Sequence, residues 1–269
     1  MKGSRARATV FLGGGRITSA LVAGLRLSGY EQPIIVHDRH AQKLGKLKRQ
    51  YNVVIDHDLR RAVDQARLLI IAVRPDGISE LLDAIGSIGR PIAAISLAAG
   101  VPLAKLRAHL GPPIRWARAM PSPVCRSGRG LTALTFEPAL SRRARREVKQ
   151  LFERVGQVIE IAERKFDAFT VTYSSSHGYH ALAALAGAAQ KAGLDRKTAI
   201  TAAAHALTDG ILVWRESKMA LDELLREAAT PGGTAATVMA AMSSAGYERA
   251  VAKGLRAGMA RARKNAGSR

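Results

Sequence analysis

The chain has 269 residues, 47% of them hydrophobic and 23% charged, so it can hold two domains and has the composition of an ordinary globular protein. No segment reaches the roughly 18 apolar residues of a membrane span, and the run Val10–Leu12 is too short for a signal-peptide core. The single cysteine, Cys125, excludes an internal disulfide. We therefore expect a cytoplasmic protein without a membrane partner.

The net charge is unusually high. The chain has 42 Lys and Arg against 21 Asp and Glu, which gives a net charge of +21. Such a field suits nucleic acid, a phosphate-bearing cofactor with an anionic substrate, or a solvated basic surface. The basic residues concentrate only at 141–147 and 261–269, and aromatic residues make up 4%. This pattern disfavours specific nucleic-acid recognition and favours salt-sensitive, non-specific binding.

Short apolar runs alternate with amphipathic segments over residues 1–162. This alternation is typical of an α/β fold, a doubly wound parallel sheet with helices on both faces. The predicted strands are Thr9–Leu12, Pro33–His37, Asn52–Ile55, Leu68–Val73, Pro91–Leu97, Ile114–Ala119, Leu131–Phe136 and Gln157–Ile161. The predicted helices are Ile17–Ser28, Ala41–Arg49, Ile78–Ile85 and Leu103–Leu110.

The stretch "VFLGGGRITSAL" places a glycine run between the first strand and the first helix. In that context Gly13 permits a tight turn, and Gly15 allows a pyrophosphate to approach the helix amides, with Arg16 and Ile17 opening the helix. The third motif position holds Thr18 instead of glycine, so a plain strand-to-helix turn is the alternative. We predict a Rossmann-type dinucleotide-binding domain over residues 1–162.

The second strand ends in "VHDRH". Asp38, about 20 residues after the glycines, would suit a free ribose hydroxyl, whereas Arg39 and His40 would suit a 2′-phosphate. We favour NADP as cofactor, with NAD as the alternative. A solvated charge at the strand end is the structural alternative for Arg39.

From Asp167, expected to be a helix cap, the pattern is wholly helical and rich in alanine. Helices with so little side-chain bulk must pack closely to bury enough surface, which a dimer would achieve, and a self-contained bundle is the alternative. We predict a second, helical domain over 163–269. Its expected helices are Ala181–Ala192, Lys197–Trp214, Met219–Ala228, Thr234–Ala245 and Tyr247–Arg263.

The stretch "ATPGGTAA" interrupts these helices. Pro231 is tolerated at a helix start, and Gly232 and Gly233 leave the following amides uncovered. Free N–H donors at the positive end of a helix bind anions. A substrate carboxylate is the expected occupant, and a helix–helix corner is the structural alternative.

Five blocks in order resemble the pyrroline-5-carboxylate reductases over about Val10 to Arg263. These are "LLIIAVRPDGI", "AAISLAAGV", "RWARAMPSPV", "DAFTVTYSS" and "ATPGGTAATVMAAMSSAGYERAVAKGLRAG". The resemblance implies that the helical domain over 163–269 binds the substrate and forms a homodimer or higher homo-oligomer. The resemblance implies reduction of the cyclic imine pyrroline-5-carboxylate to proline by NAD(P)H, as the last step of proline biosynthesis. It also implies cofactor contacts at Val73, Arg74, Pro75, Ala98, Ala99 and Gly100, and substrate contacts at Thr230, Gly232, Gly233 and Thr234.

The group that supplies a proton to the imine nitrogen during reduction is less well defined by the sequence. Family members typically carry a second Thr after Thr234, and this chain has Ala235. In addition to Thr234, the stretch "YSSSHGYH" offers Ser176, His177 and Tyr179 as candidate proton donors. A helix N-cap or a polar dimer contact is the alternative for this stretch, and we expect no metal site there.

Two further functions stay open at this point. One is a paralogous reductase that acts on a different imine or carbonyl compound. The other is a basic, nucleic-acid-associated or regulatory protein that keeps the fold without the activity.

Overall fold

The structure is a computed structural model that describes residues 8–267, and it divides into two compact units. The first contains the described residues up to Val171 and those from Gly258 on, and the second is Thr172–Ala257. The predicted division at residue 162 differs from this one. Both α7 (Glu163–Thr172), except its last residue, and the carboxyl end of α12 (Tyr247–Gly267) group with the first unit.

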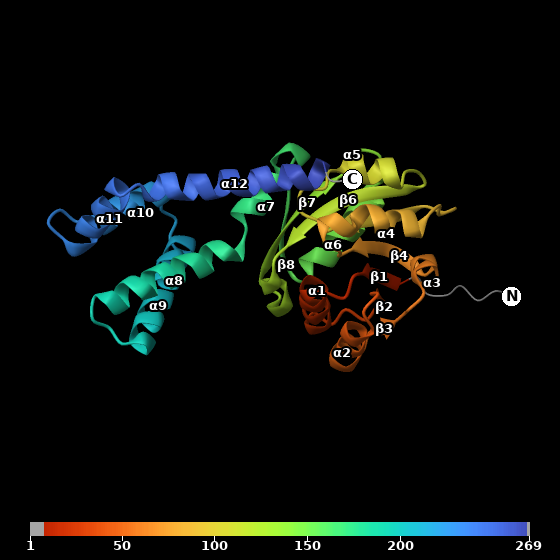
Figure 1. Ribbon diagram of the computed structural model, residues 1–269, viewed down its shortest axis with the longest axis horizontal. Coiled ribbons are helices and arrows are strands. Elements are labelled where there is room, and N and C mark those ends of the chain that lie inside the picture. Colours follow the sequence, from red (N-terminus) through yellow and green to blue (C-terminus); the bar gives the residue numbers. More distant parts are fainter. Residues whose placement is uncertain (1–7, 268–269) are drawn as a thin grey trace. The chain divides into compact units, whose positions relative to one another are not determined.

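The first unit is built on one eight-stranded sheet in the order β3-β2-β1-β4-β5-β6-β7-β8 (Figure 1). The first six strands are parallel, β7 runs antiparallel to β6, and β8 is parallel to β7. The predicted doubly wound α/β sheet is confirmed, except that its pairing is not parallel throughout. The strands are β1 (Ala8–Leu12), β2 (Ile34–His37), β3 (Val54–Ile55), β4 (Ala66–Ile71), β5 (Ile92–Ser96), β6 (Ile114–Pro121), β7 (Gly130–Phe136) and β8 (Gly156–Glu160).

Helices cover both faces of the sheet and create two cores. One core joins the sheet to α1 (Arg16–Leu27), α2 (Ala41–Tyr51) and α6 (Arg142–Glu153) through residues such as Leu21 and Phe152. The other joins it to α3 (Leu59–Asp64), α4 (Ile78–Ile85) and α5 (Leu103–His109) around Trp116. Because both faces are covered, strands such as β4 carry a continuous apolar run, here "LLII".

Three helices escaped the sequence analysis: α3, α6 and α7. The first is short, and α6 begins in the basic run 141–147. There Ser141 caps the helix by accepting a hydrogen bond from the Ala144 N–H, while Val148, Leu151 and Phe152 are buried. The amphipathic pattern of α6 is present in the sequence, but it begins within the strongly basic run 141–147.

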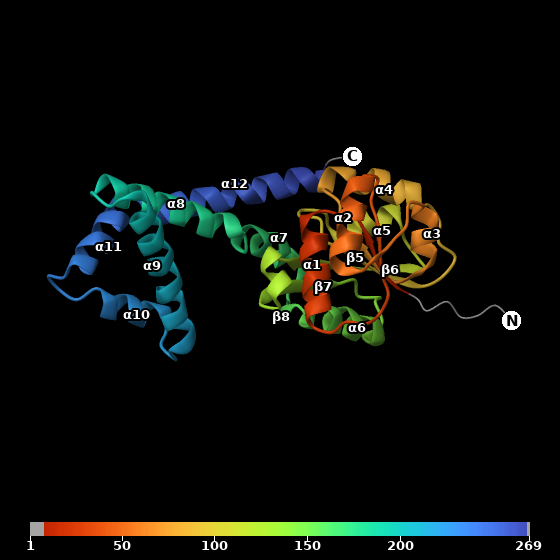
Figure 2. The same ribbon diagram turned by 90° about the horizontal axis from the view of Figure 1, so that it is seen from below.

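The second unit consists of helices only, as predicted. It comprises α8 (Ser175–Lys191), α9 (Arg196–Glu216), α10 (Leu221–Ala228), α11 (Thr234–Ser244) and the amino-terminal part of α12 (Figure 2). Its buried positions are Ala186, Ala199, Ala203 and Gly246. Large apolar side chains remain exposed, among them Ile211 at 56% and Trp214 at 44%. Within the described residues, no helix is long and apolar enough to span a membrane.

Candidate functional site

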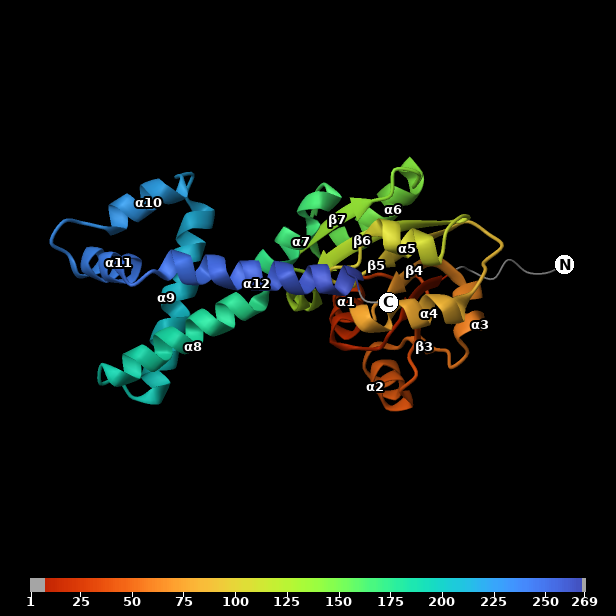
Figure 3. The same ribbon diagram turned by 45° about the horizontal axis from the view of Figure 1, so that its top comes forward.

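The carboxyl ends of four adjacent parallel strands, β2, β1, β4 and β5, lie along one edge of the sheet in the first unit, and Figure 3 labels β4 and β5. Just beyond the strands, the Gly13 N–H donates to His37 O at 2.7 Å, the Ala72 N–H to Leu12 O at 2.8 Å, and the Leu97 N–H to Ile71 O at 3.0 Å. The strand order reverses between β1 and β4, and ligands bind at such a switch point in open α/β sheets.

The glycine turn is shaped by contact with the β4 end. Gly13 has a φ of +110°, and a β-carbon there would lie 2.6 Å from Ala72 O. Only glycine fits both the backbone angle and the space. Thr18, fully buried, donates its hydroxyl to Gly13 O at 2.5 Å. The third motif position thus holds the turn by a hydrogen bond.

The amino end of α1 is open. Its N-cap is Gly15, without a side-chain cap, and within residues 8–267 the amides of Gly15, Arg16 and Ile17 make no hydrogen bond. No described atom lies within 4 Å of a β-carbon built on Gly15. Uncovered amides at the positive end of a twelve-residue helix, facing open space, suit a pyrophosphate.

Asp38 is engaged inside the chain. Its carboxylate accepts the Gly14 N–H at 2.7 Å and the His40 N–H at 2.8 Å, with Lys43 Nζ at 3.6 Å. Burial raises the pKa of Asp38, but these hydrogen bonds and the Lys43 charge outweigh burial and hold the pKa below its ordinary value. The carboxylate therefore orders the turn between β2 and α2. The His40 ring and Lys43 contact this carboxylate, whereas the neighbouring Arg39 does not.

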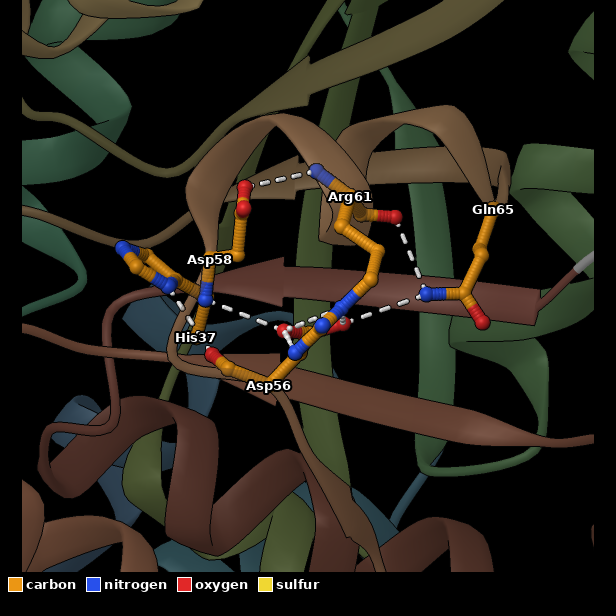
Figure 4. A network of polar contacts seen from close by, with 5 residues as sticks. All are labelled: His37, Asp56, Asp58, Arg61 and Gln65. Carbon is orange, nitrogen blue, oxygen red and sulfur yellow. Dashed lines mark hydrogen bonds and ion pairs between the residues drawn. The ribbon is translucent and has the colours of Figure 1, made fainter.

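A second carboxylate fixes the neighbouring loop. Asp56 accepts two hydrogen bonds from Arg61 Nε and one from Nη2 at 2.7 Å, and these contacts lower its pKa (Figure 4). Its backbone carbonyl bonds with His37 Nδ1 at 2.9 Å, which ties the loop after β3 to the end of β2.

Arg39, which the sequence predicts to meet a 2′-phosphate, lies exposed after β2. Its side chain is 77% exposed, and its ion pair with Glu80 is long, at 3.8 Å, and equally exposed. Such a pair contributes little stability and leaves the guanidinium free to bind phosphate. We expect Arg39→Gln to raise the KM for NADPH about tenfold, from loss of one charged contact, and to leave that for NADH unchanged. Steady-state kinetics with both cofactors measures this.

The matched control is Arg49→Gln, which removes the same charge from an exposed position at the far end of α2. An equal rise of both KM values in Arg39→Gln would contradict the assignment.

The other predicted cofactor residues lie at the same edge. Val73, Arg74 and Pro75 directly follow β4, and Val73 Cγ1 is 3.3 Å from the β-carbon position of Gly13. The turn Ala98–Gly100 follows β5. The structure thus brings the turns after β1, β2, β4 and β5 to one edge.

A buried arginine was missed by the sequence analysis. Arg118, on β6, is 1% exposed, and its Nη2 donates to Asp167 at 2.9 Å while its guanidinium lies 4.3 Å from the centre of the Phe166 ring. The expectation that Asp167 caps a helix is therefore wrong. Asp167 lies within α7 and neutralises Arg118. An arginine inside an apolar strand was the signal available for this pair.

Cys125 is inert. It is fully buried, and burial raises the pKa of its thiol to about 12. The thiolate is the reactive form of cysteine, so this side chain serves as packing.

In the second unit, the predicted anion loop is a turn with an open helix end. The Gly233 N–H donates to Thr230 O at 2.9 Å, and Gly232 has a φ of +77°. Of the amides at the start of α11, those of Thr234, Ala235 and Ala236 make no hydrogen bond within the described chain. Gly233 is thus used to build the turn, and the free donors begin at Thr234.

Of the candidate proton donors, Thr234 lies at this loop, whereas Ser176, His177 and Tyr179 do not lie beside it in one chain. Ser174 caps α8 and its hydroxyl is 2.7 Å from that of Ser176, so the N-cap interpretation of this stretch is confirmed. His177 and Tyr179 are exposed in the first turn. In all three views the α10–α11 loop lies at the opposite end of the unit from the amino end of α8 (Figure 1, Figure 2 and Figure 3). Within residues 8–267, no three metal-ligating side chains gather.

A doubly wound sheet with a glycine turn at its switch point, followed by a helical unit, defines the class of dinucleotide-dependent oxidoreductases. Comparison with known proteins agrees. Residues 9–100 match the family described as NADP oxidoreductase, coenzyme F420-dependent, and residues 163–265 match pyrroline-5-carboxylate reductase dimerisation.

Relatives span nearly the whole chain. The pyrroline-5-carboxylate reductase of Synechocystis sp. is 29% identical over 251 residues, which cover 91% of this chain and 93% of the relative. That of Corynebacterium melassecola is 29% identical over 242 residues, 87% of this chain and 90% of the relative. Over most of its length the chain is thus similar to pyrroline-5-carboxylate reductases, and its carboxyl-terminal part matches their dimerisation domain.

Solved structures agree with the fold. The pyrroline-5-carboxylate reductase of Coxiella burnetii superposes with a TM-score of 0.83 at 26% identity, covering 97% of this chain and 98% of its own. The enzyme of Plasmodium falciparum with NADP bound has a TM-score of 0.87 at 18% identity, over 98% of this chain and 100% of its own.

Proposed function

We propose that this protein reduces pyrroline-5-carboxylate to proline with NADPH. The observation that carries the proposal is the presence of two uncovered helix ends, one in each unit, on a chain whose relatives are pyrroline-5-carboxylate reductases. The α1 end suits the cofactor pyrophosphate, and the α11 end suits the substrate carboxylate. A paralogous substrate and a nucleic-acid-associated role are not favoured by these relatives.

When bound, the nicotinamide supplies the hydride that the imine carbon accepts. The chain's own residues bind and orient. The amides of Gly15 to Ile17 hold the pyrophosphate, Arg39 pairs with the 2′-phosphate, and the amides from Thr234 on fix the carboxylate. The protonated form of the ring nitrogen is needed during transfer, and Thr234, Ser176, His177 and Tyr179 are the candidates that hold this proton.

The second unit supports a homodimer or higher homo-oligomer. Family matching assigns 163–265 to a dimerisation domain, and the exposed apolar side chains of α9 need cover. A second copy of the chain is the proposed partner. The cytoplasm stays the predicted location, since Cys125 is a lone buried thiol.

The proposal is tested by following NADPH and NADH oxidation with pyrroline-5-carboxylate and with larger cyclic imino acids. Oxidation driven by pyrroline-5-carboxylate is expected, with NADPH preferred. If only a larger imine is reduced, the chain is a paralogue. If neither cofactor binds while DNA is held at moderate salt, the reductase proposal fails.

The carboxylate site is tested by removing one amide. We expect Thr234→Pro to raise the KM for pyrroline-5-carboxylate about tenfold or more over that of Thr234→Val, because an N–H bond to a carboxylate contributes about 1.5–3 kcal/mol. Proline is tolerated at the first helical position, and Gly233 before it has the extended backbone that proline requires.

Both variants lose the hydroxyl, so their difference isolates the amide. NADPH binding is expected to be the same in both. Equal KM values for the imino acid in the two variants would remove the carboxylate assignment.

A further inference from the structure

The carboxyl end of α12 packs directly on the turn after β5, inside the first unit. Gly100 has a φ of +77°, and a β-carbon there would stand 2.4 Å from Ala262 O and 2.9 Å from Ala262 Cα. Ala262 is 5% exposed. No residue but glycine allows these two backbones to approach so closely.

Asn265, one turn further along α12, completes the contact. Its Nδ2 donates to Ala99 O at 3.2 Å across 166 positions of sequence. The same loop is held at its other end by Glu163, whose carboxylate accepts the Leu103 N–H at 2.6 Å. The loop from Ala98 to Leu103 is thus fixed by α7 and α12, which follow it far along the chain.

The Asn265 contact sets the direction of a free donor. In a trans peptide the carbonyl and the following N–H point in opposite directions. Since Ala99 O faces α12, the Gly100 N–H points away from it. Gly100 is buried, and its N–H makes no hydrogen bond within residues 8–267. A buried amide without a partner is rare, so a ligand group is the expected acceptor.

The position of this donor indicates which half of the cofactor it meets. In a doubly wound sheet the end of β2, here with Arg39, takes the adenosine ribose. The turn after β5 lies on the other side of the switch point between β1 and β4. The nicotinamide half therefore occupies the β5 side.

We propose that Asn265 is a positioning residue for the nicotinamide half of the dinucleotide. By holding the Ala99 carbonyl, it aims the Gly100 N–H at a polar atom of that half. This inference rests on the proposed use of NADPH.

The test compares NADPH with 2′-phospho-ADP-ribose, which lacks the nicotinamide. In Asn265→Asp the side chain keeps its shape but cannot donate. Direct titration is expected to show the dissociation constant of NADPH rising about five- to tenfold, because one hydrogen bond is lost. The dissociation constant of 2′-phospho-ADP-ribose is expected to stay unchanged. The kcat for imine reduction is expected to fall by a similar factor, with the thermal midpoint nearly unchanged.

Arg263→Gln is the control, because it changes the net charge by the same amount at an exposed position of the same helix. It is expected to bind both probes as the wild type does. Equal weakening of both probes in Asn265→Asp, or unaltered NADPH binding, would overturn the positioning role alone. A wild-type protein that binds neither probe would overturn the proposed cofactor itself.

Discussion

Replacing Gly15 by valine is expected to weaken NADPH binding at least about 100-fold while the fold stays intact. Gly15 has an ordinary φ of −79°, and a β-carbon there meets no described atom within 4 Å. The fold itself therefore does not require glycine. A valine side chain would instead fill the space before the α1 amides and exclude the pyrophosphate, with loss of several charged hydrogen bonds of about 1.5–3 kcal/mol each.

The measurement is NADPH titration together with thermal unfolding. Gly89→Val is the matched control, since Gly89 also has open space around its β-carbon position but lies before β5, at the amino end of the strand. It is expected to bind NADPH normally. A Gly15→Val protein that binds NADPH as tightly as the wild type would disprove the cofactor site.

Gly13 gives the contrasting result. In Gly13→Ala the β-carbon would stand 2.6 Å from Ala72 O at a φ of +110°, so stability should fall by about 2–5 kcal/mol from strain and overlap. The two glycines of one turn are thus expected to be separable, with Gly13→Ala lowering stability and Gly15→Val weakening cofactor binding.

The second large effect is expected on self-association. On α9, Ile200, Ala204, Leu207, Ile211 and Trp214 recur at alternating spacings of four and three residues and form one stripe. Ile211→Lys places a charge in this stripe. Burial of one isoleucine contributes about 1.5–3 kcal/mol, and a symmetric dimer loses it twice, so its dissociation constant should rise about 100-fold or more. Analytical ultracentrifugation over a concentration series measures this.

Asp209→Asn is the control because it raises the net charge by the same amount from the opposite side of α9. Its ion pair with His205 is exposed, at 62% and 71% side-chain exposure, and contributes little. Unchanged association of Ile211→Lys would show that another surface joins the copies.

The sequence located the cofactor turn because its signals are local. Gly13 and Gly15 act through the backbone next to them, and strands buried on both faces must be apolar along their whole length. All eight strands were therefore predicted to within about two residues at each end, an error typical of boundary assignments. The open end of α11 followed from Pro231 and Gly232 for the same reason.

Contacts between residues that only the fold brings together could not be predicted from the sequence. The sequence assigned Asp38 only to a ribose hydroxyl, and its bond with the Gly14 N–H was not predicted. Asp167 resembled a cap, and only the packing of α7 on β6 placed it against Arg118. A residue's partner across a sheet depends on strand order, which local patterns do not specify.

By itself the sequence determined the class of fold, the glycine turn and the open helix end at α11, because each depends on periodicity or on backbone freedom over a few residues. The tertiary structure alone decided which carboxylates are engaged within the chain, that Gly100 and Ala262 share one contact, and that Asn265 holds the Ala99 carbonyl. These depend on segments up to 166 positions apart, whose approach is decided by how the helices pack on the sheet.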